Sequence, residues 1–574
     1  MTADFDVLIA GGGLAGLSLA RQLRFEHPEI RVLVAEKRRH PAPEAAFKVG
    51  ESTVEIAAHY FHTRLRLAAH LRSAQLEKFG LRYFYPSSDN RRIDERFELG
   101  PTDFPPVPSF QLDRGRLENF LLEEARNAGV DVIDACRVTG VEFGDPAHRI
   151  GIRTGDSSRA VTARWLVDAT GRHGLLRRKL NLNHAVGHGA NASWFRIRRP
   201  LKVDDWSDDA VWRGRVASGN RWLSTNHLMG RGYWVWLIPL GSGSTSVGIV
   251  ADDVLHPAAR ISRFEGALDW LREFEPQCAD VVADTRGDLE DFLALRHFAH
   301  GCKQVYSAEG RWALVGEAGP FTDPFYSPGS DFIAMGNEFT ANLIACELAG
   351  GDVGRRAALF DSTYLRLYDA FLRLYEKQYP MMGHAEAMTA KIAWDNACYW
   401  AITALIFYQK RLADPAFLTS IEPLMRRFFV LHARMQVFLR TWSETVPPIC
   451  APGATSVVAH DELRDLQAAL GEEPMGSEDL RARLEANLTW LERFAAAWRA
   501  AAVDSAGAEI GRLVPVGDVA PVDLGALRTS AAVPGSAVRR CGGSFQGSGS
   551  GSGSGASSRA GADASWSGGS KSQP

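Results

Sequence analysis

A glycine-rich turn close to the N-terminus constrains the fold more than any other feature of the sequence. Residues 7–16 read VLIAGGGLAG, an apolar strand pattern that leads into G-x-G-x-x-G and then into an apolar helix through Leu23. In this spacing the first glycine allows a tight turn, the second lets a pyrophosphate approach the backbone, and the third lets the helix pack closely on the strand. We therefore predict a Rossmann-type α/β domain that binds a nucleotide at Gly11, Gly13 and Gly16. The alternative is a glycine-rich turn with a purely structural role.

An acidic residue follows at the spacing that a ribose contact requires. Glu36 ends the second predicted strand, twenty residues after Gly16. Its carboxylate can accept hydrogen bonds from both ribose hydroxyls, which argues against a 2′-phosphate and hence against NADP. We place Arg38, two residues further on, at the same nucleotide site.

The composition narrows the possible partners. Lys and Arg number 65 and Asp and Glu 68, so the formal charge of −3 gives no overall field that would attract nucleic acid or acidic lipid. We expect a small-molecule or protein-bound substrate.

The seven cysteines show no C-x-x-C spacing, which disfavours a metal site and a disulfide framework. Because the N-terminus also lacks the pattern of a signal peptide, we expect a reduced, cytoplasmic protein.

Three regions follow one another along the chain. Residues 1–350 alternate short strands with helical stretches, and the strand-rich part at about 183–300 predicts an inserted β-sheet on the substrate side. Residues 351–530 show apolar spacings of three and four, which predicts a mainly helical region. The apolar stretch 397–408 is shorter than the ~20 residues of a membrane span and is expected to form a buried helix. Residues 531–574 are rich in Gly and Ser and are predicted to be disordered.

Two further motifs resemble the flavoprotein monooxygenase superfamily. Residues 165–172 (WLVDATGR) resemble its D-A-T-G strand end, and residues 316–324 (GEAGPFTDP) resemble its G-D/E to D-P segment. The resemblance implies FAD as the cofactor. By the same resemblance, the predicted FAD contacts are Asp168, Gly171, Asp323, Pro324 and Gly329.

The segment SFQLDRGRLENFL is predicted to contribute to the FAD site. Gln111, Asp113 and Arg114 match a stretch that usually lies along the flavin in this superfamily, and Gln111 and Arg114 are the predicted cofactor contacts. The alternative is the N-terminal cap of a helix with solvated charges.

Residues 232–239 (GYWVWLIP) narrow the chemistry. They contain W-x-W-x-I-P, which resembles the signature of the flavin-dependent halogenases. Strand alternation puts Trp234 and Trp236 on one face, and Pro239 ends the strand. The resemblance implies that this wall keeps the substrate away from the flavin, so that the oxidant formed there meets halide. The alternative is a pair of core tryptophans in an antiparallel sheet.

Lys78 is the predicted catalytic lysine. It precedes F-G-L-R-Y-F and follows the G-E-S-T motif at residues 50–53, an arrangement that resembles the halogenase segment with its lysine. The resemblance implies that Lys78 holds hypohalous acid or a chloramine beside the substrate, and we place Gly50 and Ser52 at the cofactor. Partial desolvation would lower the pKa of such an amine. Its alternative is a solvated lysine at a helix end, and Lys48 is kept as a second candidate.

The segment after D-P departs from the halogenases that act on free tryptophan. Those proteins have a glutamate and then Ser-Thr-Gly, whose N–H groups hold the halide, whereas residues 323–330 here read DPFYSPGS. Tyr326 stands where the acid would be, which argues against free tryptophan and towards a phenol, pyrrole or carrier-tethered substrate. Pro328 has no N–H and removes one donor. Halide binding would therefore fall to Ser327, Gly329 and Ser330.

Together the motifs predict an FAD-dependent halogenase. Reduced FAD, oxygen and chloride or bromide would give hypohalous acid, which halogenates an electron-rich aromatic or carrier-tethered substrate through Lys78. Since no second nucleotide motif is visible, we expect a separate flavin reductase as partner. The C-terminal helices would cover the substrate, dock a carrier protein, or simply pack as an ordinary helical layer. A monooxygenase or reductase of the same fold, which Pro328 favours, and a non-catalytic flavin-binding scaffold are the alternatives.

Overall fold

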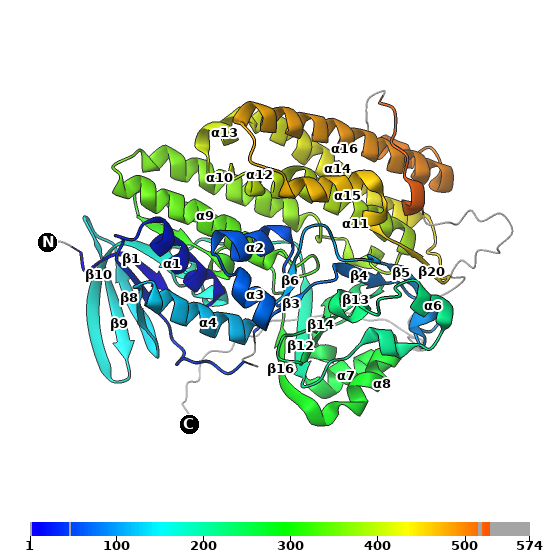
Figure 1. Ribbon diagram of the computed structural model, residues 1–574, viewed down its shortest axis with the longest axis horizontal. Coiled ribbons are helices and arrows are strands. Elements are labelled where there is room, and N and C mark those ends of the chain that lie inside the picture. The colour runs from blue at the N-terminus through cyan, green and yellow to red at the C-terminus, as the bar shows by residue number, and fades with distance from the viewer. Residues whose placement is uncertain (1–2, 45–47, 515–518, 529–574) are drawn as a thin grey trace, which may run out of the picture. The chain divides into compact units, whose positions relative to one another are not determined.

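The computed structural model describes residues 3–44, 48–514 and 519–528. The predicted Gly/Ser-rich tail at 531–574 lies outside these residues. Helices and strands alternate through the first part of the chain, and helices dominate the second part (Figure 1).

The first sheet confirms the Rossmann-type prediction. Its strand order is β18-β19-β10-β1-β2-β7, with β9 pairing with β10 and β8 pairing with β9. β1 pairs in parallel with both β2 and β10, and Val7, Leu8 and Ile9 and their partners on both strands are apolar and buried, as expected where helices cover a parallel sheet. The strands are β1 (Phe5–Ala10), β2 (Val32–Ala35), β7 (Asp131–Ile133), β8 (Cys136–Glu142), β9 (His148–Thr154), β10 (Ser157–Asp168), β18 (Tyr306–Ser307) and β19 (Trp312–Leu314).

Three helices of this body are packed together beside the sheet. α1 follows β1 directly and contacts both α4 and α9. These helices are α1 (Leu14–Glu26), α4 (Arg114–Asn127) and α9 (Gly329–Leu348). The start of α1 therefore lies at the carboxyl end of β1, which is where an open α/β sheet binds its ligand.

A second sheet carries the Trp pair. Its order is β16-β12-β15-β14-β13-β4-β5-β20, and a separate hydrophobic cluster lies between this sheet and α7 and α8. The segment 183–300 supplies five of the eight strands, and the others come from before and after it. The elements are β4 (Leu81–Phe84), β5 (Phe97–Leu99), β12 (Ala190–Ile197), β13 (Thr225–Gly230), β14 (Tyr233–Pro239), β15 (Thr245–Asp252), β16 (Leu289–Leu295), β20 (Gly453–Thr455), α7 (Phe264–Phe274) and α8 (Pro276–Asp284).

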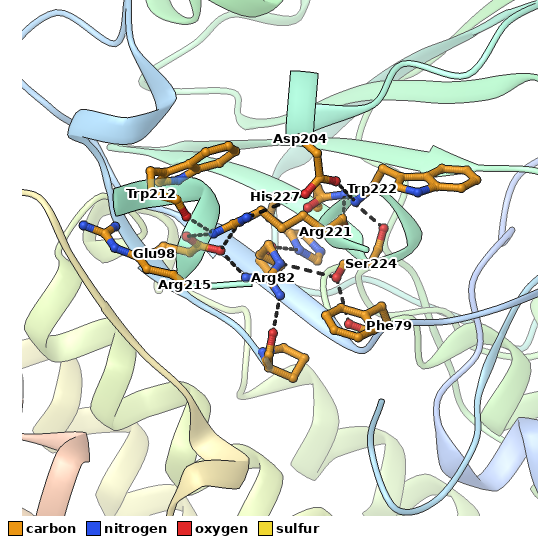
Figure 2. Close-up of polar contacts among 12 residues, drawn as sticks. Phe79, Arg82, Glu98, Asp204, Trp212, Arg215, Arg221, Trp222, Ser224 and His227 are labelled. Carbon is orange, nitrogen blue, oxygen red and sulfur yellow. Dashed lines mark hydrogen bonds and ion pairs between the residues drawn. The ribbon is translucent and has the colours of Figure 1, made fainter. Parts of the chain in front are cut away.

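A buried ionic network fixes β4 against its neighbours. Figure 2 shows the carboxylate of Glu98 between the guanidinium groups of Arg82 and Arg221, and all three side chains are at most 2% exposed. The ring of His227 also contacts the carbonyl oxygen of Arg82, with Nδ1 and O separated by 2.9 Å. Because side chains alternate along a strand, anchoring Arg82 on one face of β4 directs Tyr83 to the other face.

The C-terminal region is helical, as predicted. Its helices share one continuous hydrophobic cluster with the Rossmann-type sheet, and α10 contacts α9 (Figure 1). Residues 397–408 form buried helix, including a π-helical segment at Tyr399–Ala404. The helices are α10 (Val353–Leu372), α11 (Ala385–Cys398), α12 (Leu405–Tyr408), α13 (Pro415–Ser420), α14 (Glu422–Thr445), α15 (Asp461–Ala468) and α16 (Ser477–Ala506).

Short elements complete the described chain. They are α2 (Glu55–His59), a π-helical turn at Tyr60–Arg64, α3 (Ala68–Ala74), β3 (Leu76–Glu77), β6 (Phe110–Gln111), α5 (Leu175–Lys179), β11 (Asn183–His184), α6 (Ala210–Gly214) and β17 (Gly301–Cys302).

The expectation that the chain carries no disulfide is wrong at Cys450, which is disulfide-bonded. Within the described residues, no helix is long and apolar enough to cross a membrane. The five free thiols are Cys136, Cys278, Cys302, Cys346 and Cys398.

Candidate active site

The glycine turn between β1 and α1 has the geometry of a pyrophosphate site. A Cβ on Gly11, whose φ is +113°, would clash with the carbonyl of Ala169, and one on Gly16 would clash with the carbonyl oxygen of Gly11. At Gly13 no atom lies within 4 Å of the corresponding position, and no side chain caps the start of α1. Free N–H groups at a helix N-terminus favour a phosphate, so the turn fits the ADP half of FAD.

Glu36 lies directly beside this turn. Its carboxylate accepts hydrogen bonds from the backbone N–H of Gly12 at 2.6 Å and of Arg38 at 2.8 Å. A carboxylate has roughly four acceptor positions, so it can still accept from a ribose hydroxyl. The residues at this end of the sheet therefore fit a dinucleotide.

Two predicted cofactor carboxylates accept hydrogen bonds from other groups of the protein. Asp168 accepts hydrogen bonds from the N–H groups of Thr170 at 2.9 Å and Leu176 at 2.7 Å. Asp323 accepts from the N–H of Phe325 at 2.9 Å and from the hydroxyl of Tyr379 at 2.7 Å. Both carboxylates are fully buried, so they shape the loops at Gly171, Pro324 and Gly329.

The predicted Arg114 site is likewise paired within the protein. Arg114 forms an ion pair with Glu118 at 2.6 Å and donates to the carbonyl oxygen of Val49 at 2.5 Å, and its guanidinium lies beside Gly50. Lys48 pairs with the same glutamate. Asp113, just before Arg114, caps α4 through the N–H of Arg116, as the alternative interpretation of this segment expected.

Lys78 follows β3 and is 1% exposed, so the solvated alternative is wrong. Its Nζ donates hydrogen bonds to the Ser52 hydroxyl at 2.9 Å and to the carbonyl oxygen of Thr53 at 2.8 Å. Ser52 contacts Thr225, which Gln111 also contacts through its amide at 3.1 Å. The G-E-S-T motif thus holds the lysine, and Lys48, paired elsewhere, is the weaker candidate.

Burial makes the charged form of the Lys78 amine less favourable. It lowers the pKa of Lys78 to about 7, although Glu55 and Asp331 nearby favour the charged form. Burial likewise raises the pKa of Asp331 to about 7. Near neutral pH, both groups therefore exchange protons readily, which is the behaviour expected of acid–base groups in an active site.

The two tryptophans lie on one face of β14, as predicted. The centroids of Trp234 and Trp236 are 5.7 Å apart, and the side chains are 1% and 3% exposed. Trp234 donates from Nε1 to the hydroxyl of Tyr379 at 3.1 Å and lies 5.2 Å from the ring of Phe325, which follows the D-P pair. The wall therefore packs directly against the loop that ends at α9.

Two of the three predicted halide donors remain available at the start of α9. The N–H of Ser327 donates to the carbonyl oxygen of Pro324 at 2.8 Å, so its backbone is engaged in the turn. Gly329 and Ser330 form the first turn of the helix, which no side chain caps. Backbone N–H groups of a first turn have no partner within the helix, so these two remain suitable for an anion.

A pocket extends from Lys78 to the C-terminal helices. Its walls are mostly apolar. Its lining includes residues that were not among the predicted site residues: Glu55, Asp331, Asp395, Tyr399 and His432. Asp331 was detectable, because it directly follows the D-P segment. Glu55 begins α2, and the other three belong to helical segments distant in the chain, so none of the four lies within a motif.

The sequence as a whole is similar to halogenases. The FAD binding domain family matches residues 4–248. A flavin-dependent halogenase from Dictyostelium discoideum is 27% identical over 448 residues, which is 72% of each chain. This chain is a relative of the flavin-dependent halogenases. The 1H-pyrrole-2-carbonyl peptidyl-carrier-protein chlorinase of Pseudomonas fluorescens is 25% identical over 61% of this chain and 76% of that one.

Solved structures agree with this halogenase fold. The halogenase PltM has a TM-score of 0.60 at 16% identity, over 89% of this chain and 98% of that chain. This likeness shows the fold, whereas the FAD binding domain match and the halogenase relatives support an FAD-dependent oxidoreductase of the halogenase type, for which halide is the co-substrate.

Proposed function

We propose that this halogenase acts on an electron-rich aromatic substrate bound in the pocket beside Lys78. Bound reduced FAD, together with oxygen and halide, supplies hypohalous acid. The burial of Lys78 at the pocket wall, with two of its hydrogen bonds fixed by Ser52 and Thr53, is the observation that carries the proposal. Its remaining position can bind the hypohalous acid beside the substrate, and the Trp pair separates this reaction from the flavin.

The substrate can be free or carrier-tethered. One relative is named as a carrier-protein chlorinase, and PltM has been solved in complex with phloroglucinol and FAD. A separate flavin reductase would deliver the reduced flavin, because one dinucleotide turn at Gly11–Gly16 is all that the sequence provides.

The test supplies the purified chain with FAD, a flavin reductase, NADH, oxygen and bromide, using simple phenols and pyrroles as acceptors. The product should carry bromine, which mass spectrometry identifies by its isotope pattern. Lys78→Met should reduce product formation by at least about a hundredfold, since positioned catalytic groups contribute on that scale. The variant should still bind FAD, which its absorbance spectrum reports.

Lys303→Met is the matched control, because Lys303 is a lysine outside the pocket that contacts the carbonyl oxygen of Asn181. It should keep wild-type turnover. Unchanged bromination in Lys78→Met would exclude the proposed role of this lysine.

A monooxygenase is the second candidate function, and the α9 turn favours it. Pro328 has no N–H, and the N–H of Ser327 is engaged with Pro324. The same reaction mixture distinguishes the two, because a hydroxylated product without bromine identifies the monooxygenase.

A further inference from the structure

A cluster of polar side chains from α11 and α14 forms part of the pocket wall. Asp395 lines the pocket, and its side chain is 2% exposed. Its Oδ2 accepts hydrogen bonds from the Tyr326 hydroxyl and from Lys391 Nζ, each at 2.8 Å, and its Oδ1 accepts from Gln436 Nε2 at 2.7 Å. Since a carboxylate has about four acceptor positions, one position remains open.

Two more pocket-lining groups have polar atoms without a partner. Within the described residues, the hydroxyl of Tyr83 and Nδ1 of His432 are buried and make no hydrogen bond. The two residues are 1% and 5% exposed, and Asp395 interacts electrostatically with both. Leaving such groups unpaired is costly, so each indicates a ligand atom that completes it.

The polar atoms of the cluster differ in whether they require a hydrogen-bond donor or an acceptor. The Tyr83 O–H needs an acceptor, whereas the open position on Asp395 needs a donor. A hydroxyl group satisfies both at once, because it donates and accepts, whereas the N–H of a pyrrole or indole only donates. Aromatic and aliphatic side chains beside the cluster, such as Phe371, Ile392 and Phe428, suit a ring system.

We propose that Asp395, Tyr83 and His432 form a subsite that binds the hydroxyl group of a hydroxylated aromatic substrate. This inference rests on the proposed function for its catalytic meaning and names the class of substrate. A ring hydroxyl that donates to a carboxylate gains electron density, which favours attack by an electrophilic halogen. The ion pair between Lys391, which is fully buried, and Asp395 compensates the charge of the carboxylate.

The subsite also accounts for Tyr326 at the position where tryptophan halogenases have an acid. The Tyr326 hydroxyl donates to Asp395, so the carboxylate reaches this pocket from α11, 69 residues further along the chain.

The experiment compares three probes of similar size by calorimetric titration of the full chain in the absence of halide and reductant. 2-Naphthol both donates and accepts, 2-methoxynaphthalene only accepts, and indole donates through N–H. 2-Naphthol should bind about tenfold more tightly than either of the others, as one hydrogen bond to a charged group predicts. Equal dissociation constants for the three probes in the wild-type chain would overturn the proposal.

Variants assign the selectivity to the subsite. Asp395→Asn should reduce the preference for 2-naphthol over 2-methoxynaphthalene to less than about threefold, while the affinity for 2-methoxynaphthalene stays the same. Tyr83→Phe should reduce the preference for 2-naphthol over indole to less than about threefold, while the affinity for indole stays the same. A merely structural role would weaken all three probes together, and that result would contradict the proposal. If Asp395→Asn does not fold, Tyr83→Phe and the comparison of the probes in the wild type still show whether the subsite binds the hydroxyl group.

Asp361→Asn is the matched control. Asp361 is a carboxylate on α10 that accepts hydrogen bonds from the N–H groups of Val305 and Tyr306 outside the pocket, and its variant should keep the preference. Because binding is measured without turnover, failure of halogenation leaves this result intact. Conversely, brominated products without any preference for 2-naphthol would reject the subsite and keep the proposed function.

Discussion

At the scale of single residues, burial brings the pKa values of two oppositely charged groups close together. Lys78 and Asp331 both line the pocket, and burial moves the pKa of each to about 7, downwards for the amine and upwards for the carboxyl. Desolvation penalises whichever form is charged, which explains why the two shifts have opposite sign.

The shift of Lys78 should be visible in stability. Its pKa falls from 10.5 to about 7 on folding, so between these values the unfolded chain binds more protons. The free energy of unfolding from this site therefore rises with pH, by up to about 1.4 kcal/mol per pH unit. Lys78→Met should lose this slope in urea unfolding between about pH 7.5 and 9.5.

Asp331 does not affect this comparison of Lys78→Met with the wild type, because its carboxyl group titrates at lower pH. Its pKa rises from 3.8 to about 7 on folding, so its contribution to stability falls with pH only between those values. Lys303→Met should keep the wild-type slope. Parallel curves for Lys78→Met and the wild type would show that the amine is not desolvated as the structure indicates.

At the scale of elements, the turn between β1 and α1 separates glycines needed for folding from those needed for binding. Gly16 packs against Gly11, whereas Gly13 faces open space. Gly13→Ala should keep the thermal midpoint within a few degrees but weaken FAD binding by at least about tenfold, since the methyl group occupies the space of the pyrophosphate. Retained FAD affinity would place the phosphates elsewhere.

Gly16→Ala is its counterpart and should lower stability even without FAD. The added Cβ clashes with the Gly11 carbonyl oxygen, so α1 must move away from β1. Overpacking typically costs about 1–3 kcal/mol, which thermal unfolding of the apoprotein measures. An unchanged midpoint would contradict the close packing described for this turn.

The hydroxyl of Tyr399, at the start of the π-helical segment after α11, joins α2 to α9. Tyr399 accepts from the N–H of Ile56 at 3.0 Å and donates to Asp331 Oδ2 at 2.6 Å. Tyr399→Phe should lower the free energy of unfolding by about 1–3 kcal/mol, measured in urea. It should also raise the pKa of Asp331 further, because the lost hydrogen bond favoured the carboxylate. A variant with both properties unchanged would show that the junction does not depend on this group.

At the scale of the whole molecule, the helical region and the Rossmann-type body share one hydrophobic cluster. β20 of the helical region also pairs with β5 of the second sheet. A chain cut after residue 350 would expose the faces of α9 and α2 that contact α10 and α12. Contiguous apolar faces that are exposed to solvent promote aggregation.

We therefore expect residues 1–350 to be insoluble or to unfold without a cooperative transition. Far-UV circular dichroism and size-exclusion chromatography of this fragment, beside the full chain, measure the outcome. A monomeric fragment that unfolds cooperatively and binds FAD would instead support the separate domain predicted from the sequence.

The sequence by itself determined the features that are local in the chain. The glycine turn, the strand of the Trp pair and the α4 cap depend on neighbouring residues, because turn geometry and alternation act over a few positions. These predictions agree with β1, β14 and Asp113 in the structure. The family motifs likewise indicated Lys78 as the candidate lysine.

Only the tertiary structure decided how buried Lys78 is and what faces it. Asp395 and His432 lie more than three hundred residues further along, on helices whose spacing predicts packing and nothing more. The hydrogen bonds and ion pairs that Asp168, Asp323 and Arg114 form within the protein were equally invisible. Desolvation and hydrogen bonding depend on what surrounds a group in space, and no pattern within one stretch of chain records that surrounding.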